Sequence, residues 1–132
     1  MASIFSKIIA GEIPCHKVAE SSNYFAFLDI RPVSKGHTLV VPKNEVDYVF
    51  DLDNHTYLGL MEFAKKVAKA MDQALKPIRV GITVEGLEVP HAHVHLIPMY
   101  AEGGPFRLGR SIELKSDEMR HIAEYIAKHL HQ

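Results

Sequence analysis

Residues 91–98 read His-Ala-His-Val-His-Leu-Ile-Pro, and this run constrains the fold of the chain more than any other stretch. Histidines alternate strictly with apolar residues, and a period of two is the pattern of a β-strand, whose successive side chains point to opposite faces. The apolar residues are therefore predicted to face a core, and His91, His93 and His95 to line up on the other face. The sequence thus predicts a strand that presents three imidazoles together.

The spacing of these imidazoles narrows the chemistry that they can perform. A strand rises about 3.3 Å per residue, so neighbouring histidines are rooted about 7 Å apart and the outer two about 13 Å apart. Two histidines at this spacing can share one metal ion, whereas three on one straight strand do so only with difficulty. A purely structural row and a metal site remain open, but the pattern favours imidazole chemistry, as a nucleophile, a general base or a proton relay.

Length, charge and cysteine content set the limits on the rest. The 132 residues are expected to form one domain, 1–132, long enough to bury a core. A formal net charge of −1 gives no basic field, so a nucleic-acid duplex is not an expected partner. No apolar run reaches the roughly 18 residues of a membrane span, and residues 1–7 lack the pattern of a secretion signal. The single cysteine, Cys15, excludes an internal disulfide and fits a reducing compartment, so we expect a cytoplasmic protein without a membrane partner.

The hydrophobic pattern predicts an α+β domain in which helices cover a mostly antiparallel sheet of about five strands. A long helix and a C-terminal helix are both expected to pack on this sheet. The expected elements, in order, are helical turns at 3–10, a hairpin of strands at 15–20 and 24–30, a strand at 37–41, a helix at 53–75, strands at 78–84 and 91–97, and a helix from 116.

The His-x-His-x-His run resembles the motif of the histidine triad (HIT) family. Three upstream stretches, residues 4–14, 26–32 and 36–43, also resemble the Hint-like branch of that family in order and spacing. The resemblance covers residues 4 to about 98. It implies a HIT-like fold with a triad-bearing core at about 3–98, followed by a C-terminal loop and helix at 99–132.

Family resemblance also implies the reaction. Members are nucleotide hydrolases and transferases that cleave the bond to the α-phosphate of a nucleoside monophosphate derivative, here expected to be a purine nucleotide. Carried over by position, His93 would attack the phosphorus and form a covalent nucleotidyl-histidine intermediate, which water then hydrolyses. His95 would contact the phosphate, and His91 and His37 would belong to the hydrogen-bonded network that orients His93. The expected substrates are nucleoside phosphoramidates or dinucleoside polyphosphates.

The resemblance implies a nucleotide-binding slot with one carboxylate. Asp29 would accept hydrogen bonds from the ribose hydroxyls, although an Asp before Arg31 and Pro32 is also a common turn-forming residue. An apolar, aromatic slot suits a flat base. The nucleotide-binding candidates are Phe5, Ile8, Phe27, Leu28, Asp29, Ile30 and Glu88.

The chain departs from the family pattern just before the triad. Hint-like members usually have Gly-Gln-Ser/Thr-Val there, whereas this chain has Gly86-Leu87-Glu88-Val89. An ionised Glu88 at close range would repel a phosphate by about 1 kcal/mol or more. The alternative function is therefore a nucleotide-binding module with reduced catalysis.

No metal and no cofactor are expected. Some bacterial relatives carry a Cys-x-x-Cys near the N-terminus as part of a zinc site, but this chain has Ser3 and Ser6 at those positions. Serine is a poor zinc ligand. A metalloprotein that uses His91, His93 and His37 remains a third hypothesis.

The expected partners are a small AMP-like or GMP-like nucleotide and a second copy of the chain. The resemblance implies a homodimer. The long helix at 53–75 supports it, because its stripe of eight apolar residues is wider than one small sheet needs. The strand at 78–84 would provide an edge for a second subunit to protect.

Overall fold

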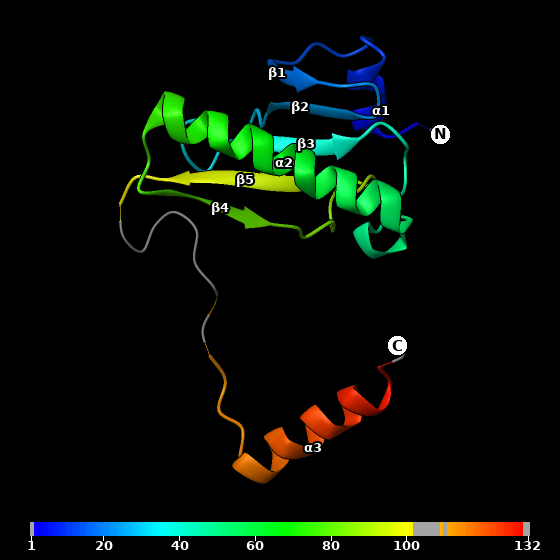
Figure 1. Ribbon diagram of the computed structural model, residues 1–132, viewed down its shortest axis with the longest axis vertical. Coiled ribbons are helices and arrows are strands. Elements are labelled where there is room, and N and C mark those ends of the chain that lie inside the picture. The colour runs from blue at the N-terminus through cyan, green and yellow to red at the C-terminus, as the bar shows by residue number, and fades with distance from the viewer. Residues whose placement is uncertain (1, 102–108, 110, 131–132) are drawn as a thin grey trace.

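Five strands pair antiparallel into one open sheet, in the spatial order β1-β2-β3-β5-β4 (Figure 1). The computed structural model describes residues 2–101, 109 and 111–130. This arrangement confirms the predicted α+β class and the antiparallel sheet of five strands. The elements along the chain are α1 (Ile4–Ile9), β1 (Lys17–Glu20), β2 (Tyr24–Leu28), β3 (Thr38–Pro42), the 3-10 helix η1 (Val49–Asp51), α2 (Asn54–Leu75), β4 (Arg79–Thr83), β5 (Val94–Met99) and α3 (Ser116–Lys128).

The pairing of β3 with both β2 and β5 brings distant parts of the sequence together. The loop between β2 and β3 closes on itself, because the Asp29 backbone N–H donates to the His37 carbonyl oxygen at 3.0 Å. Leu39 of β3 lies opposite His95 of β5, and Thr83 of β4 lies opposite His95 on its other side. The register therefore places His95 between segments from β3 and β4.

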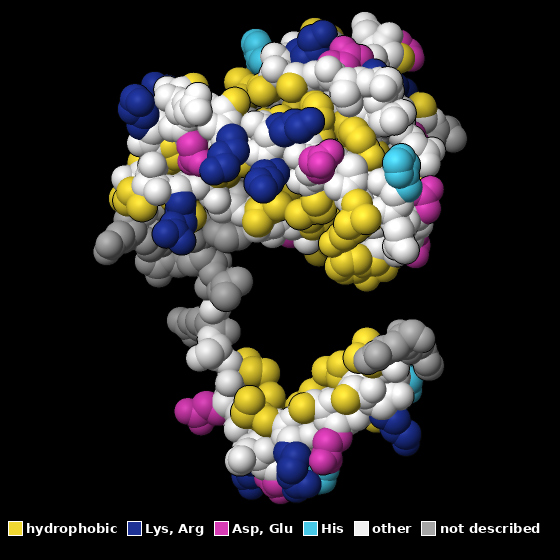
Figure 2. All heavy atoms as spheres, in the orientation of Figure 1, with side chains coloured by type: hydrophobic (Ala, Val, Ile, Leu, Met, Phe, Trp, Pro, Cys, Tyr) yellow, Lys and Arg dark blue, Asp and Glu magenta, His cyan; other side chains and the backbone are white. Residues whose placement is uncertain are grey.

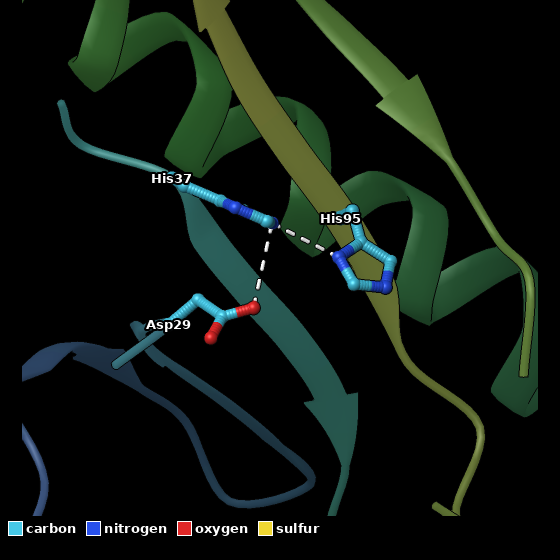
Figure 3. A group of neighbouring side chains, drawn as sticks. All are labelled: Asp29, His37 and His95. Atoms are coloured by element: carbon cyan, nitrogen blue, oxygen red, sulfur yellow. Dashed lines mark hydrogen bonds and ion pairs between the residues drawn. The ribbon is translucent and has the colours of Figure 1, made fainter. Parts of the chain in front are cut away.

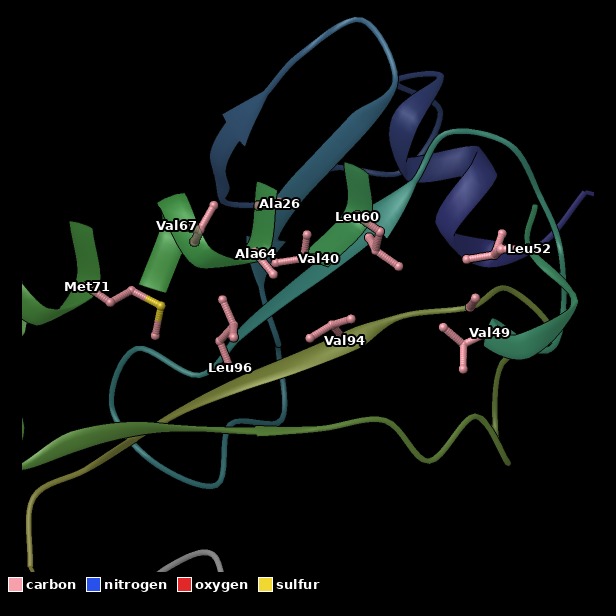
Figure 4. Close-up of a cluster of buried hydrophobic side chains, with 11 residues drawn as sticks. Ala26, Val40, Val49, Leu52, Leu60, Ala64, Val67, Met71, Val94 and Leu96 are labelled. Carbon is pink, nitrogen blue, oxygen red and sulfur yellow. The ribbon is translucent and has the colours of Figure 1, made fainter. Parts of the chain in front are cut away.

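The long helix α2 covers one face of the sheet. It begins where the Asp53 side chain accepts a hydrogen bond from the Thr56 backbone N–H at 2.7 Å, and it ends at Lys76 in the left-handed region, before Pro77. Its buried residues pack on apolar residues of β2, β3 and β5 (Figure 4). The main members of this first core are Leu60, Ala64, Val67 and Met71 of the helix with Ala26, Val40, Val94 and Leu96 of the strands.

The opposite face carries α1 over β2 and β3. Phe5 of this short helix packs with Phe25 and Phe27 in a second apolar cluster. Side chains alternate along a strand, so Phe25 and Phe27 face α1 while Ala26 between them faces α2. The short helix leaves the part of this face over β5 and β4 for a cleft.

The triad strand starts later than the sequence predicts. The prediction began it at His91, but β5 begins at Val94, so His91 and His93 precede it. The backbone there bonds to loops instead of a strand, because the His91 N–H donates to the Val89 carbonyl and the Ala92 N–H to the Val46 carbonyl. The alternation itself persists, since Ala92, like the apolar residues of β5, is buried in the first core.

The prediction that the C-terminal helix packs on the sheet is wrong for this chain. Residues of α3 are all exposed, and Figure 2 shows apolar side chains gathered along one side of it. Helix α2 covers one face of the sheet, and α1 packs on β2 and β3 of the other. Amphipathic spacing showed that α3 needs an apolar surface, but not which surface it meets. Its exposed apolar residues include Met119, Ile122, Tyr125 and Ile126.

A membrane-crossing helix is not found within residues 2–101 and 111–130, because each helix there is too short or too polar.

Candidate active site

A cleft of about 660 Å³ opens on the sheet face opposite α2. The segment between β2 and β3, the end of β4, the loop at 85–88 and β5 all contribute residues to its lining. His37, His93 and His95 are among them, together with Asp29 and Glu88. Five of the predicted site residues therefore line one cavity, although they come from segments up to 66 positions apart along the chain.

His93 is held in one tautomer by a backbone atom. Its Nδ1 lies 2.8 Å from the carbonyl oxygen of His91, and a carbonyl oxygen can only accept. Nδ1 therefore carries the proton, and Nε2 carries the lone pair. The Phe5 ring stands edge-on to this imidazole, with ring centroids 4.9 Å apart, and fixes its plane. His93 is thus an oriented imidazole that lines the cleft, and in its uncharged form Nε2 carries the lone pair.

His37 and His95 form a second chain of hydrogen bonds (Figure 3). The Val33 backbone N–H donates to Nδ1 of His37 at 3.2 Å, so the proton of His37 must sit on Nε2. That Nε2 lies 2.9 Å from Nδ1 of His95 and donates to it. His95 in turn carries its proton on Nε2. The Val33 amide thereby sets the tautomers of both rings and leaves His95 as a hydrogen-bond donor.

Burial keeps these two imidazoles neutral. Desolvation lowers the pKa of His37, and the nearby Asp29 carboxylate opposes this only in part. The pKa of His95 is also lowered, first by burial and then by the neighbouring His93 and His37 imidazoles, while Asp29 and Glu85 act in the opposite direction. Neutral rings are what the hydrogen-bond chain requires, because a doubly protonated ring has no acceptor nitrogen.

His91 was predicted to belong to the hydrogen-bonded network that orients His93, and it does hydrogen-bond to His93. The residue is fully buried and does not line the cleft. Its Nε2 donates to the Pro42 carbonyl oxygen at 2.7 Å, and its Nδ1 accepts from the Ser3 hydroxyl at 2.7 Å. His91 contacts His93 through its carbonyl oxygen instead of its ring. The reason is the late start of β5, which turns this residue away from the strand face that holds His95.

The two serines noted at the N-terminus form a hydrogen-bonded cluster with Glu45. The Ser3 backbone N–H and the Ser6 hydroxyl both donate to Oε1 of Glu45, at 2.7 and 2.6 Å. These hydrogen bonds lower the pKa of the Glu45 carboxyl. Ser3 then donates to His91, so the cluster supports the residue whose carbonyl holds His93. Sequence reasoning missed Glu45, which lies 42 positions from Ser3 and has no local signal.

Asp29, His37 and His95 are the described residues whose ligand atoms lie close enough for a metal, all within 4.8 Å of one another (Figure 3). The Val33 N–H weighs against coordination there. It occupies Nδ1 of His37, so a metal at Nε2 of that ring would displace its proton and cost the amide its acceptor. The donor set fits proton sharing better than it fits a metal ion.

The nucleotide-binding candidates divide into two groups. Asp29 and Glu88 line the cleft. Asp29 also makes the turn contact that was the alternative reading, since its Oδ1 accepts from the Arg31 backbone N–H at 2.8 Å, while Oδ2 lies 3.7 Å from Nε2 of His37. The apolar candidates lie outside the cleft lining: Phe5 and Phe27 are buried beside it, Ile8 packs on their cluster, Leu28 is half-buried at the end of β2, and Ile30 is 80% exposed.

Further residues line the cleft without having been predicted as site residues, among them Arg31, Thr83 and Glu85. Arg31 lies two residues after Asp29, so the prediction of Asp29 as a site residue could have pointed to it. Glu85 belongs to the same short loop as Glu88. Thr83 is brought in by its register opposite His95, which no sequence pattern specifies.

Fold and site together define a histidine triad protein. A family model described as the HIT domain matches residues 10–102, and the chain belongs to this family. It is 36% identical to "Protein hit" of Bacillus subtilis over 96% of this chain and 93% of that protein. It is 34% identical to the adenosine 5'-monophosphoramidase hnt1 of Schizosaccharomyces pombe, over 96% of this chain and 97% of the relative. The latter name supports the Hint-like branch.

Solved structures agree with the family assignment. A crystal structure of a HIT family member from Bacillus subtilis superimposes with a TM-score of 0.88 at 34% identity, covering 100% of this chain and 99% of the other. A histidine triad nucleotide-binding protein from Candida albicans gives a TM-score of 0.77 at 28% identity, with 96% of each chain covered.

The lowered histidine pKa values predict a pH dependence of stability. The pKa values of His37, His91 and His95 lie below the ordinary 6.5 in the folded protein, so the unfolded chain binds more protons just below pH 6.5. These histidines should contribute their whole stabilisation above about pH 6.5. The free energy of unfolding should then fall as the pH drops toward the lowered histidine pKa values. Urea unfolding at a series of pH values measures this.

A matched pair of variants tests the origin of that dependence. His95→Gln should flatten the curve, whereas His121→Gln, at an exposed position of α3, should leave it unchanged. An NMR titration of the native protein in which His95 titrates at or above 6.5 contradicts the interpretation.

Proposed function

We propose that the protein is a nucleotide hydrolase or transferase that cleaves the bond to the α-phosphate of a purine nucleoside monophosphate derivative. The observation that carries this proposal is the tautomer of His93, whose Nε2 lone pair is free because Nδ1 donates to the His91 carbonyl. An oriented, neutral imidazole is a competent nucleophile near pH 7. Nε2 attacks the phosphorus and forms a nucleotidyl-histidine, which water hydrolyses.

His95 supports this step as a hydrogen-bond donor to the phosphate. Its Nε2 carries a proton because Nδ1 accepts from His37. The chain from the Val33 amide through His37 to His95 is built from groups that stay neutral and therefore keep their donor and acceptor roles. Charge that develops on the phosphate oxygens meets a donor that is already aligned.

The relatives support a nucleoside phosphoramidate as the substrate. One relative is named an adenosine 5'-monophosphoramidase in Schizosaccharomyces pombe. This chain's Asp29, at the opposite end of the cleft from the loop at 85–88, is suited to the ribose hydroxyls through Oδ2, since Oδ1 already accepts from Arg31. Phe5 and Phe27 are buried beside His93 and outside the cleft lining, so they would support the proposed base slot without lining it.

A nucleotide-binding module with reduced catalysis is the second candidate. The observation that favours it is the position of Glu88, an acid in the cleft lining where Hint-like members usually have a hydroxyl. A burst of product with a nucleotidyl group trapped on His93 separates the enzyme from this module.

We also propose that residues 1–132 act as one functional domain in the cytoplasm. Gly109, beyond the triad core, lines the cleft, which connects the C-terminal part to the site. The single cysteine, Cys15, is unpaired and half-buried, as suits a reducing compartment.

The first prediction from this function concerns the nucleophile. His93→Ala should lower turnover of an adenosine phosphoramidate by about 10³-fold or more, because a covalent pathway is lost. The fold should persist, as judged by circular dichroism and the thermal midpoint. His121→Ala on α3 is the matched control and should keep full activity. Near-normal activity in His93→Ala, or a larger loss in His91→Ala, would refute the assignment of roles.

The second prediction concerns ribose. Asp29→Ala should weaken binding of AMP far more than binding of its 2′,3′-dideoxy analogue, because each charge-assisted hydrogen bond to a hydroxyl contributes roughly 1.5–3 kcal/mol. Calorimetric titration of both ligands measures the difference, with Asp72→Ala on α2 as the control. Equal losses for the two ligands would leave Asp29 as a turn residue only.

The protein is further proposed to be a homodimer. β4 is an edge strand, and an apolar groove of about 270 Å³ lies beside it, lined by Tyr48, Phe50 and Ile82 among others. Those three side chains are 56%, 68% and 46% exposed. A second copy would cover them and protect the strand edge.

Sedimentation equilibrium at micromolar concentration tests the assembly. The expected mass is twice that of the chain. A mass near the 14.8 kDa of one chain would rule out the dimer.

A further inference from the structure

The cleft lining is acidic on the described part of the chain. Asp29, Glu85 and Glu88 contribute carboxylates, and Arg31 contributes a guanidinium. With neutral imidazoles, the described lining has a formal charge of −2. Neither Glu85 nor Glu88 forms an ion pair with another residue in the described ranges. Positively charged side chains would be expected around a negatively charged phosphate, whereas Glu85 and Glu88 bring negative charge to this cleft.

The strand order places the segment after β4 on the side of His95 away from Asp29. Across the sheet, Asp29 follows β2, His37 precedes β3, His95 lies on β5 and Glu85 follows β4. Asp29 and Glu85 therefore flank His95 on opposite sides. If Asp29 binds the ribose, as proposed above, and His95 the phosphate, the remaining substituent on phosphorus lies on the side of Glu85 and Glu88.

Leu87, which lies between Glu85 and Glu88 in the sequence, supports the placement of the leaving group on this side. It is 90% exposed and lines the same cleft. An exposed leucine flanked by two carboxylates suits an aliphatic chain that ends in a positive charge, because the chain contacts the leucine while the charge meets the acids. A polyphosphate or nucleotide leaving group would instead bring several negative charges to the same place.

We propose that the leaving group is an aliphatic amine carrying a second amino group that is charged at neutral pH, as in an α,ω-diamine, and that Glu85 and Glu88 select it. This specificity rests on the proposed function, and it disfavours dinucleoside polyphosphates as substrates. The two glutamates act as specificity-determining residues for the group that departs.

The reaction proceeds in two steps. The lone pair of His93 Nε2 forms a bond to phosphorus, the P–N bond to the amine breaks, and the amine nitrogen takes up one proton from solvent and leaves as the free amine. Water then adds its hydroxyl to phosphorus as the bond to His93 breaks, and its second proton is released. The neutral imidazole is restored, and no oxidant or reductant is needed.

Three adenosine 5′-phosphoramidates with the same four-carbon chain test the proposal. They are made from 1,4-diaminobutane, n-butylamine and 4-aminobutyrate, so the distal group is cationic, neutral or anionic. The wild-type kcat/KM should decrease in that order, by on the order of 2- to 5-fold per carboxylate and per unit of charge at low ionic strength. Added salt should reduce the spread, since the acids are exposed.

Isosteric Glu→Gln variants show which residues cause the preference for the cationic substrate. Glu85→Gln and Glu88→Gln should each reduce the ratio of kcat/KM between the cationic and anionic substrates, and the double variant should bring it close to one. Glu62→Gln, at an exposed position of α2, is the matched control and should keep the wild-type ratio. Thermal midpoints establish that each variant is folded.

The possible results distinguish failure of the proposed leaving-group specificity from failure of the proposed hydrolase function. Turnover of all three substrates at equal kcat/KM, or a ratio unchanged in the double variant, overturns the selection of a cationic amine. Failure of the wild-type protein to turn over any of the three, with no nucleotidyl group on His93, overturns the proposed function itself.

Discussion

The hydrogen bond from His93 Nδ1 to the His91 carbonyl is the contact on which the rest of the site depends. It determines that the nitrogen on the other side of the ring has a lone pair. The surrounding structure holds the carbonyl in place. The His91 ring is anchored between the Pro42 carbonyl and the Ser3 hydroxyl, and Ser3 is tied to Glu45. Helix α1 and the serine before it thus hold a backbone atom on which the proposed catalysis depends, although these serines lie outside the cleft.

The cleft holds two separate hydrogen-bond arrangements, whose rings meet where His93 and His95 lie with their centroids 4.9 Å apart. One fixes His93 through His91, and the other fixes His95 through His37 and the Val33 amide. The second depends on burial, which lowers the pKa values of His37 and His95, because a ring that stays neutral keeps one donor and one acceptor nitrogen. The apolar packing of Phe5 against His93 and of α2 beneath β5 therefore supports the chemistry directly, by keeping water from these rings.

Much of the fold was predictable, because periodicity reports which side of an element is buried. The apolar positions of the triad run and of α2 enter one core as predicted, and the ends of α2 follow its capping aspartate and the proline after it. The placement of Asp29 with the histidines followed only from the family resemblance. Long-range contacts were not predictable from the sequence. Nothing near Glu45 in the sequence indicates its hydrogen bonds to Ser3 and Ser6. No sequence pattern shows that His91 lies before the start of β5. The position of α3 was predicted wrongly because an apolar stripe shows that a helix needs an apolar surface to pack on, but does not identify that surface.

The atoms that set the protonation of the site belong largely to the main chain. The carbonyl oxygens of His91 and Pro42 and the amide of Val33 would be present whatever side chains stood at 42 and 33, except that a proline at 33 has no amide hydrogen. Such a site tolerates wide drift in the sequence around it, so long as the backbone follows the same path. Conversely, a relative could retain all three histidines and still lose the arrangement through one proline. Judging whether a distant homologue is active therefore requires attention to where its prolines fall as well as to its histidines.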